Sequence, residues 1–573
     1  MKRILKTVLS TVFLLSLIIP NFAMAANNPH HELFTPSPNA KANSPLSAYS
    51  SFAKIPNYFN GRLGIGVYNT PPTRLANTYF GFEDNEAYAD TAYAEIATFG
   101  ANFAWGFWWD TSETEAYLLD ICEKYGLKFI GYADLGAYVG NFSNPSKRDA
   151  MVDYAVDWIK NIADHPALIG FEIQDEPMYD MFETVAAVRE AVEANMPANK
   201  FAIANLSTGW DNSAYLGGVS YDEYVEEYIS MAKPKMLYFD DYPLMAVSSN
   251  LSAHQSNMNR YIRSLSMISQ SAREHKIPFG GYLQATKFDM DGLLRQPDCD
   301  EMKWQANMQI AFGAKSITWY GYSAQSVGNH EFDPDDPWPP SNDTYMRDVY
   351  GALTPAWYDA QKVNLALKQF DQSYIDFTHM GLIPVNMGDY TKQLRNMKLY
   401  DSYAGIKTIQ TTGMMLNGCF EHEDGRKGIY LYNFSLDNPL NTVLSLNGLN
   451  FELWGENGLE YSDNDTSLTI SLGVGEAKFL VFERDTNPPA DETTSDSNAT
   501  PGNNPTSSDI ILSGNNSDST DSDTYKNETS DKPANSNNNA NTGDPFGTSL
   551  CIVTGVLSVV GLTFIISKKR AIN

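Results

Sequence analysis

Eight short apolar runs alternate with longer helical patterns through most of this chain, and this alternation limits the possible folds more than any other feature. Between the runs lie stretches with apolar residues every three to four positions, typical of helices that bury one face. A strand followed by a helix, repeated eight times, predicts a (β/α)₈ barrel, an α/β fold. The runs span residues 62–69, 101–108, 127–134, 168–176, 201–207, 235–242, 278–286 and 316–322.

An open, doubly wound parallel sheet is the main alternative to a barrel. Such sheets usually carry a glycine-rich phosphate-binding turn after the first strand. Here the first run ends in Tyr68-Asn69-Thr70-Pro71-Pro72, which contains no glycine. The sequence therefore favours a closed barrel, which we place at residues 51–375.

Beyond the barrel the helical patterns stop and short strand patterns follow one another. Alternating apolar and polar residues with turn residues between them predict half-buried antiparallel strands. We expect a small β-sandwich over residues 376–485, which either braces the barrel or binds glycan. The expected strands include 428–434, 443–446, 467–472 and 477–483.

Both ends of the chain have the sequence pattern of targeting segments. Basic residues precede an apolar run and an Ala-Met-Ala site, so residues 1–25 are predicted to be a signal peptide. A linker follows over 26–50. Residues 546–573 contain a short apolar span and a basic tail, which predicts a hydrophobic anchor with a transmembrane helix.

The segment 486–545 is rich in Ser, Asn, Thr and Asp and has few apolar residues, so we expect a disordered stalk. It contributes to a net charge of −29, from 40 basic and 69 acidic residues. A chain this acidic lacks the basic surface that binding to phosphates requires, which argues against nucleic acid as a partner.

The end of the stalk resembles a sortase cell-wall sorting signal of Gram-positive bacteria. Asn541-Thr542-Gly543 stands before the apolar span and the basic tail, although Asn-Ala replaces the Leu-Pro that opens the family's motif. The resemblance implies cleavage after Thr542, with sortase and peptidoglycan as partners. A retained membrane anchor is the alternative. Either places a secreted protein at the cell surface.

The four cysteines show no spacing typical of a zinc site or a disulfide framework, so we expect neither. An acidic segment around 330–336 lacks the spacing and central glycine of a calcium-binding loop. The sequence therefore predicts no metal and no cofactor.

Candidate catalytic residues follow the strands, because barrel active sites lie at the C-terminal ends of the strands. If side chains alternate regularly, Glu172, Gln174 and Glu176 share one face of the fourth strand. By the same rule Asp240 and Tyr242 share a face of the sixth. Carboxyl groups flanked by aromatic rings suit hydrolysis of a glycosidic bond, which needs one carboxylic acid and one carboxylate.

These residues also resemble a known group. The segment 170–177, ending Asp175-Glu176-Pro177, is similar to the end of strand 4 in glycoside hydrolases of clan A, where the Glu is the general acid/base. The segment 240–243 resembles strand 6 of family 42-like β-galactosidases, and 301–322 resembles their helix 7 and strand 8. The resemblance covers about residues 60–370 and implies glycosidase activity.

The chain departs from that family at strand 7. The clan places its nucleophilic Glu there, but this sequence has Gln284, and an amide is neither nucleophile nor base. Three explanations stay open. Asp240 is the second carboxylate; or Asp175 orients an acetamido group of the substrate, as in family 20 hexosaminidases; or the barrel binds glycans without cleaving them.

The sequence thus predicts a surface glycoside hydrolase that acts on poly- or oligosaccharides, with Glu176 and Asp240 as catalytic residues. The alternative is a non-catalytic glycan-binding adhesin on a degenerate barrel. The predicted substrate-binding residues are Asp134, Asp175, Asp241, Tyr242, Gln284, Trp108, Trp319 and Tyr322.

Overall fold

A computed structural model of the chain describes residues 58–70, 85–106, 111–209, 213–244, 251–287, 294–323, 345–348, 351–395 and 397–485. The predicted signal peptide, linker, stalk and anchor lie outside these residues. Within them, no helix has the length and apolar character needed to cross a membrane.

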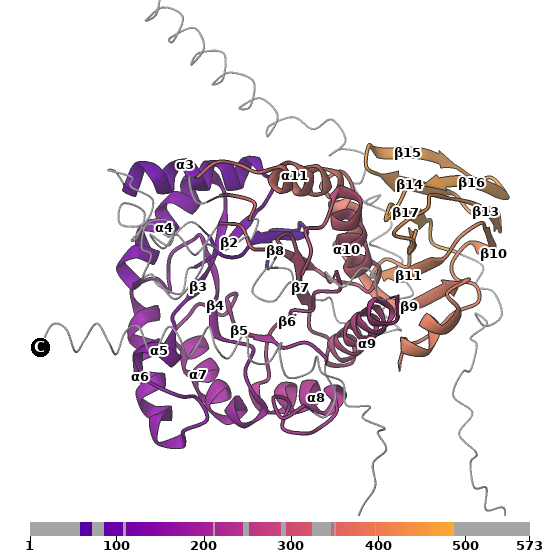
Figure 1. Ribbon diagram of the computed structural model, residues 1–573. Coiled ribbons are helices and arrows are strands. Elements are labelled where there is room, and N and C mark those ends of the chain that lie inside the picture. The colour runs from indigo at the N-terminus through magenta and orange to yellow at the C-terminus, as the bar shows by residue number, and fades with distance from the viewer. Residues whose placement is uncertain are drawn as a thin grey trace, which may run out of the picture.

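The predicted barrel is confirmed. Its eight strands are all parallel and pair in chain order, and the sheet closes where the first strand pairs with the eighth (Figure 1). The strands are β1 (Gly64–Val67), β2 (Phe103–Trp105), β3 (Lys128–Tyr132), β4 (Leu168–Asp175), β5 (Phe201–Leu206), β6 (Leu237–Phe239), β7 (Phe279–Gln284) and β8 (Ser316–Tyr320).

Helices connect successive strands and surround the barrel (Figure 1). They are α3 (Asn85–Thr98), α4 (Ser112–Tyr125), α5 (Leu135–Tyr138), α6 (Arg148–Lys160), α7 (Phe182–Ala194), α8 (Tyr221–Ala232), α9 (Leu251–His275), α10 (Cys299–Ala311), α11 (Pro355–Leu367) and α12 (Asp371–Tyr374).

Local sequence signals set several helix ends. A capping box starts α8 at Ser220, whose hydroxyl accepts from the backbone N–H of Glu223, and a second one starts α10 at Asp298. Gly126 ends α4 in the left-handed conformation that glycine adopts without strain. Gly313, just after α10, has a φ of 98°.

The interior of the barrel is filled largely by aromatic rings. Phe103 and Trp105 from β2, Tyr238 from β6 and Tyr282 from β7 form one buried cluster. The Trp105 indole N–H donates to the Thr318 hydroxyl at 3.2 Å, and the Tyr238 hydroxyl bonds the same group at 2.6 Å. The centre of the barrel is therefore a packed core, and a ligand reaches only its C-terminal end.

The predicted β-sandwich is also confirmed and consists of a six-stranded and a three-stranded antiparallel sheet. The larger sheet has the order β15-β14-β17-β12-β11-β9 and the smaller β10-β13-β16. The strands are β9 (Phe377–Val385), β10 (Ile406–Thr411), β11 (Met415–His422), β12 (Lys427–Tyr432), β13 (Leu440–Leu446), β14 (Phe451–Gly455), β15 (Gly458–Asp463), β16 (Ser467–Leu472) and β17 (Ala477–Phe482).

The sandwich packs against α10 of the barrel through buried hydrogen bonds. The Trp304 indole N–H donates to the Phe434 carbonyl at 2.8 Å. The Asn307 amide donates to the Gly475 carbonyl at 2.8 Å and accepts from the Tyr430 hydroxyl at 2.7 Å. Since α10 precedes β8, this contact braces the last barrel strand. Of the two roles expected for the sandwich, bracing the barrel and binding glycan, these contacts support bracing.

Replacing Asn307 with Ala tests how strongly this junction stabilises the fold. The change leaves the Gly475 carbonyl and the Tyr430 hydroxyl without their buried partner, so we expect a loss of about 2–3 kcal/mol in the free energy of unfolding. Gln361→Ala removes one exposed hydrogen bond to Thr98 and should change stability by less than about 0.5 kcal/mol. Urea unfolding measures both, and equal losses would contradict the assigned role.

Candidate active site

The candidate site lies where β4 and β6 end, at the C-terminal side of the barrel. Asp175 is the last residue of β4, and Glu176 follows it with a φ of 42°. This left-handed conformation is unusual outside glycine and costs about 1–3 kcal/mol. The Glu176 N–H donates to the Asn205 carbonyl at 2.8 Å, and the Tyr215 hydroxyl donates to the Glu176 carbonyl. Neighbouring elements therefore hold Glu176 in a strained backbone conformation, a feature that clusters at active sites.

The predicted regular alternation along β4 is wrong. The pairing of β4 with β5 shifts at Ile173, so that Glu172 lies opposite Ile203 while Gln174 already lies opposite Ala204. A bulge of one residue inverts the side-chain phase beyond it. Asp175, three positions after Glu172, consequently faces the same barrel interior, and Glu172, Gln174 and Glu176 do not share one face.

Glu176 and Asp240 are brought together as predicted. Glu176 acts on the pKa of Asp240 through its charge and through a side-chain hydrogen bond, so the two carboxyl groups lie close together. The Ser207 hydroxyl donates to Glu176 Oε1 at 3.3 Å. Burial, followed by the charge of Glu176, raises the pKa of Asp240 well above its usual range. Two carboxylates in contact repel unless they hold a proton between them, so this pair retains one proton at a pH where free carboxyl groups have lost theirs.

Asp175 forms the third carboxyl group of the site. The Asn205 side-chain amide donates to its Oδ1 at 2.9 Å. Burial raises the pKa of Asp175, and this hydrogen bond from Asn205 lowers it. Asp175 also raises the pKa of Asp240 through its charge. The three carboxyl groups therefore titrate together rather than separately.

Tyrosine rings line the space around these acids. Tyr242, after β6, was predicted; its ring centroid lies 5.4 Å from that of Tyr320 at the end of β8. Tyr320 in turn lies 5.9 Å from Tyr68, which follows β1. All three side chains are partly exposed. They offer flat apolar faces beside the carboxyl groups, a combination suited to a sugar ring.

The sequence prediction missed Tyr68 and Tyr320. Tyr320 shares its side of β8 with Thr318, whose hydroxyl lies in the barrel interior. Trp319 points the opposite way, and its indole N–H donates to Asn364 Oδ1 of α11 at 2.8 Å. Alternation along β8 could have identified Tyr320 in place of Trp319.

Trp319 and Tyr322 do not join the site, which corrects their prediction as sugar-binding residues. Both are 0 % exposed. The Tyr322 hydroxyl accepts from the Trp357 indole N–H at 3.2 Å, and its ring packs on Phe99. They therefore fill the layer between the barrel and α11, where burial of their large rings stabilises the fold.

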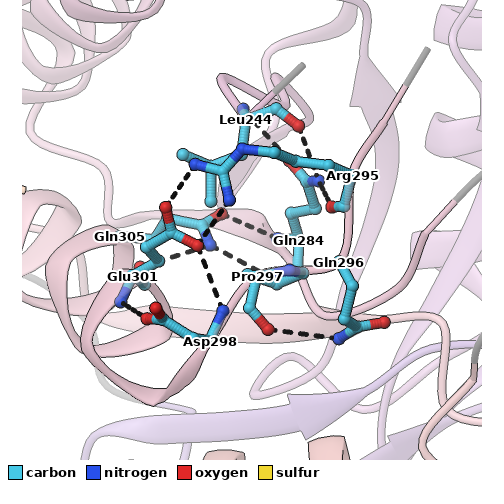
Figure 2. Close-up of polar contacts among 8 residues, drawn as sticks. All are labelled: Leu244, Gln284, Arg295, Gln296, Pro297, Asp298, Glu301 and Gln305. Atoms are coloured by element: carbon cyan, nitrogen blue, oxygen red, sulfur yellow. Dashed lines mark hydrogen bonds and ion pairs between the residues drawn. The ribbon is translucent and has the colours of Figure 1, made fainter. Parts of the chain in front are cut away.

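Gln284 is bound by backbone groups of two neighbouring loops (Figure 2). Its amide donates to the carbonyls of Leu244 and Arg295 at 3.0 and 2.7 Å, and its carbonyl oxygen accepts from the Leu244 N–H at 3.2 Å. The side chain is 0 % exposed. Three of its four hydrogen-bonding positions are thus occupied. Gln284 therefore links the loops that contain Leu244 and Arg295 and is not available to orient a sugar, which corrects the prediction.

Asp241 is likewise structural. It is 2 % exposed and forms an ion pair with Arg260 of α9, at 2.5 Å from Nη2 to Oδ1. Arg260 also donates to the Tyr242 carbonyl at 3.2 Å. The ion pair holds the backbone next to Asp240 and Tyr242 in place. Asp241 therefore has a structural role and does not line the site, which corrects the prediction.

The last two predicted residues have other placements. Asp134 caps α5 by accepting from the Ala137 N–H at 2.9 Å, and burial raises its pKa. Its charge also raises the pKa of Tyr132, so it lies at the edge of the same acidic region. Trp108 lies outside the described residues.

Within the described part of the chain, no three His, Cys, Asp or Glu residues are arranged to hold a metal ion.

Comparisons with known proteins give a fold and no family. No family model matches the chain, and no curated protein matches it. Among solved structures, it is similar to Gan42B, a GH42 β-galactosidase from G. stearothermophilus, with a TM-score of 0.51 and 9% identity over 75% of this chain and 100% of that one. A β-galactosidase from Rahnella sp. R3 gives 0.50 and 9% over the same shares. At this identity, the likeness shows a shared barrel-and-sandwich architecture.

Proposed function

We propose that this protein is a glycoside hydrolase acting on poly- or oligosaccharides at the cell surface. The contact between Glu176 and Asp240 carries the proposal, because it keeps a protonated carboxyl group at the barrel mouth. Protonating a poor alkoxide leaving group requires such an acid near neutral pH. The similarity to β-galactosidase structures and the partly exposed tyrosine rings are consistent with a sugar substrate.

In this proposal Glu176 is the general acid, and Asp240 is its proton-sharing partner. The catalytic pair of a glycosidase is about 5–9.5 Å apart, which is wider than the spacing of two carboxyl groups that share a proton. We therefore assign Asp240 the role of proton-sharing partner rather than that of the second catalytic carboxylate. Asp175, oriented by Asn205, is the better candidate for the ionised carboxylate that stabilises the transition state.

Amide variants of the carboxyl pair test these roles. Glu176→Gln cannot donate a proton, so we expect it to lower kcat by about 10²–10⁴-fold on unactivated oligosaccharides. The loss should be much smaller on 4-nitrophenyl glycosides, whose leaving group needs little protonation. Reducing-end and nitrophenol assays measure the two rates. Glu226→Gln, which changes an exposed carboxylate on α8, is the matched control.

The pH profile separates Asp240 from Glu176. Asp240→Asn removes a negative charge beside Glu176, so Glu176 should lose its proton more easily and the alkaline limb of kcat should move to lower pH. An unchanged alkaline limb would contradict proton sharing.

A wild-type protein that binds glycans but hydrolyses none of a broad panel would instead support the adhesin alternative.

Gln284→Glu tests whether the clan-type nucleophile can simply be restored at strand 7. An ionised Glu there would face the carbonyls of Leu244 and Arg295 that the amide now satisfies. We therefore expect a loss of stability of about 2–4 kcal/mol and no gain in turnover. Thermal unfolding and nitrophenyl glycoside assays measure both effects. A stable variant with increased turnover would show that Gln284 lies in the catalytic site after all.

We also propose that the protein is secreted and held at the cell wall through its C-terminal sorting signal, residues 539–544. This rests on the residues alone: the signal-like start, the polar stalk and the order of Thr-Gly, apolar span and basic tail. Deleting 543–573 should release the protein into the medium, as cell fractionation would show. If a Thr542→Ala variant is found in the membrane fraction to the same extent as wild type, the retained-anchor alternative is correct.

A further inference from the structure

The barrel contains two fully buried glutamates whose surroundings differ sharply. Glu115 and Glu172 are both 0 % exposed. Glu115 Oε1 accepts from the Tyr132 N–H at 2.6 Å, and its Oε2 accepts from the Trp158 indole N–H at 2.7 Å. Both oxygens of Glu172, by contrast, lack a hydrogen-bond partner among the described residues. Burying such a group without partners costs free energy, so its retention requires an explanation beyond packing.

The groups that face Glu172 come from most of the barrel strands. They are Asp175 on its own strand and the phenols of Tyr68, Tyr132, Tyr238 and Tyr282 from β1, β3, β6 and β7. None of them is a cation that could neutralise a carboxylate. Burial, followed by the charge of Asp175, raises the pKa of Glu172 well above its usual range. These surroundings favour the protonated form of Glu172, which can donate a hydrogen bond.

Two further buried polar atoms lack a partner among the described residues: the hydroxyl of Tyr282, a residue that interacts with Glu172, and Oδ1 of Asn205, which lies opposite Asp175 on β5. Asn205 is the residue whose amide binds Asp175. A polar interior of this kind suits an ordered water, which needs two to four hydrogen-bonding partners. Such a water would connect the Glu172 carboxyl group with Asp175 and the Tyr282 hydroxyl.

We propose that Glu172 is a positioning residue that donates a hydrogen bond, through a buried water, to Asp175. It contacts no substrate. Its donation adds to that of Asn205, orients Asp175 and opposes the burial that raises the Asp175 pKa. The mechanistic value of this arrangement rests on the proposed glycosidase function, whereas the coupling between the two residues does not.

A double-mutant cycle between Glu172→Leu and Asp175→Asn tests the coupling without any substrate. Urea unfolding at pH 7 gives the free energy of each variant. A hydrogen bond between the two residues predicts a stabilising coupling, because either single change already loses it. If Glu172 were ionised it would repel Asp175, and the coupling would have the opposite sign. Additivity, or a repulsive coupling, overturns the proposal.

Glu172→Gln and Glu115→Gln serve as matched variants. Glu172→Gln keeps a donor but removes the titrating proton, so its stability should fall less between pH 5 and 8 than that of wild type. The sign follows because a carboxyl group with a raised folded-state pKa loses stability as pH rises above its unfolded pKa. Glu115→Gln paired with Asp175→Asn should be additive. A Glu172→Gln variant with the wild-type pH dependence overturns the protonated state.

Turnover of 4-nitrophenyl glycosides supplies the functional readout. Glu172→Leu should lower kcat about tenfold with little change in KM, and the acid limb should move to higher pH because Asp175 protonates more easily. Glu172→Gln should restore most of the activity. Wild-type kcat and pH profile in Glu172→Leu would overturn the positioning role. Absence of turnover in wild type would refute the proposed function, and the cycle would still decide the coupling.

Discussion

The electrostatic coupling between Glu176 and Asp240 is the interaction on which the rest of the site depends. It joins the ends of β4 and β6, which are not neighbours in the sheet, across the mouth of the barrel. Two charges this close in a poorly solvated place would repel strongly, so the contact requires a shared proton. A closed barrel is what makes the contact possible, since its strands end around one rim.

The buried carboxyl groups of this protein differ in how their charge is compensated, and three arrangements occur among the residues discussed above. Asp241 is neutralised by Arg260, and Glu115 receives hydrogen bonds from a backbone and an indole N–H. Glu172, Asp175 and Asp240, at the barrel mouth, have neither a cationic partner nor hydrogen-bond donors for both oxygens among the described residues. Their pKa values are raised instead. Stability alone would favour compensation, so this contrast separates the structural acids from those that we assign to function.

The sequence was sufficient for the architecture and for the central pair. Strand–helix alternation predicted the barrel, and reading strand ends identified Glu176 and Asp240. It failed where local geometry departs from a regular strand or where partners come from distant segments. The bulge at Ile173 inverts the phase of β4 and brings Asp175 inward. Gln284 and Asp241 are occupied by partners in other loops and in α9, which no spacing along the chain reveals.

Infrared difference titration of the carboxyl groups tests the shared proton most directly. The account predicts that wild type keeps a protonated carboxyl signal at neutral pH, part of which disappears in Asp240→Asn at the same pH. We expect the remainder to come from the other buried acids with raised pKa values, Glu172 among them. If the variant and the wild type show the same protonated signal at neutral pH, Glu176 and Asp240 do not share a proton and the account of the site is wrong.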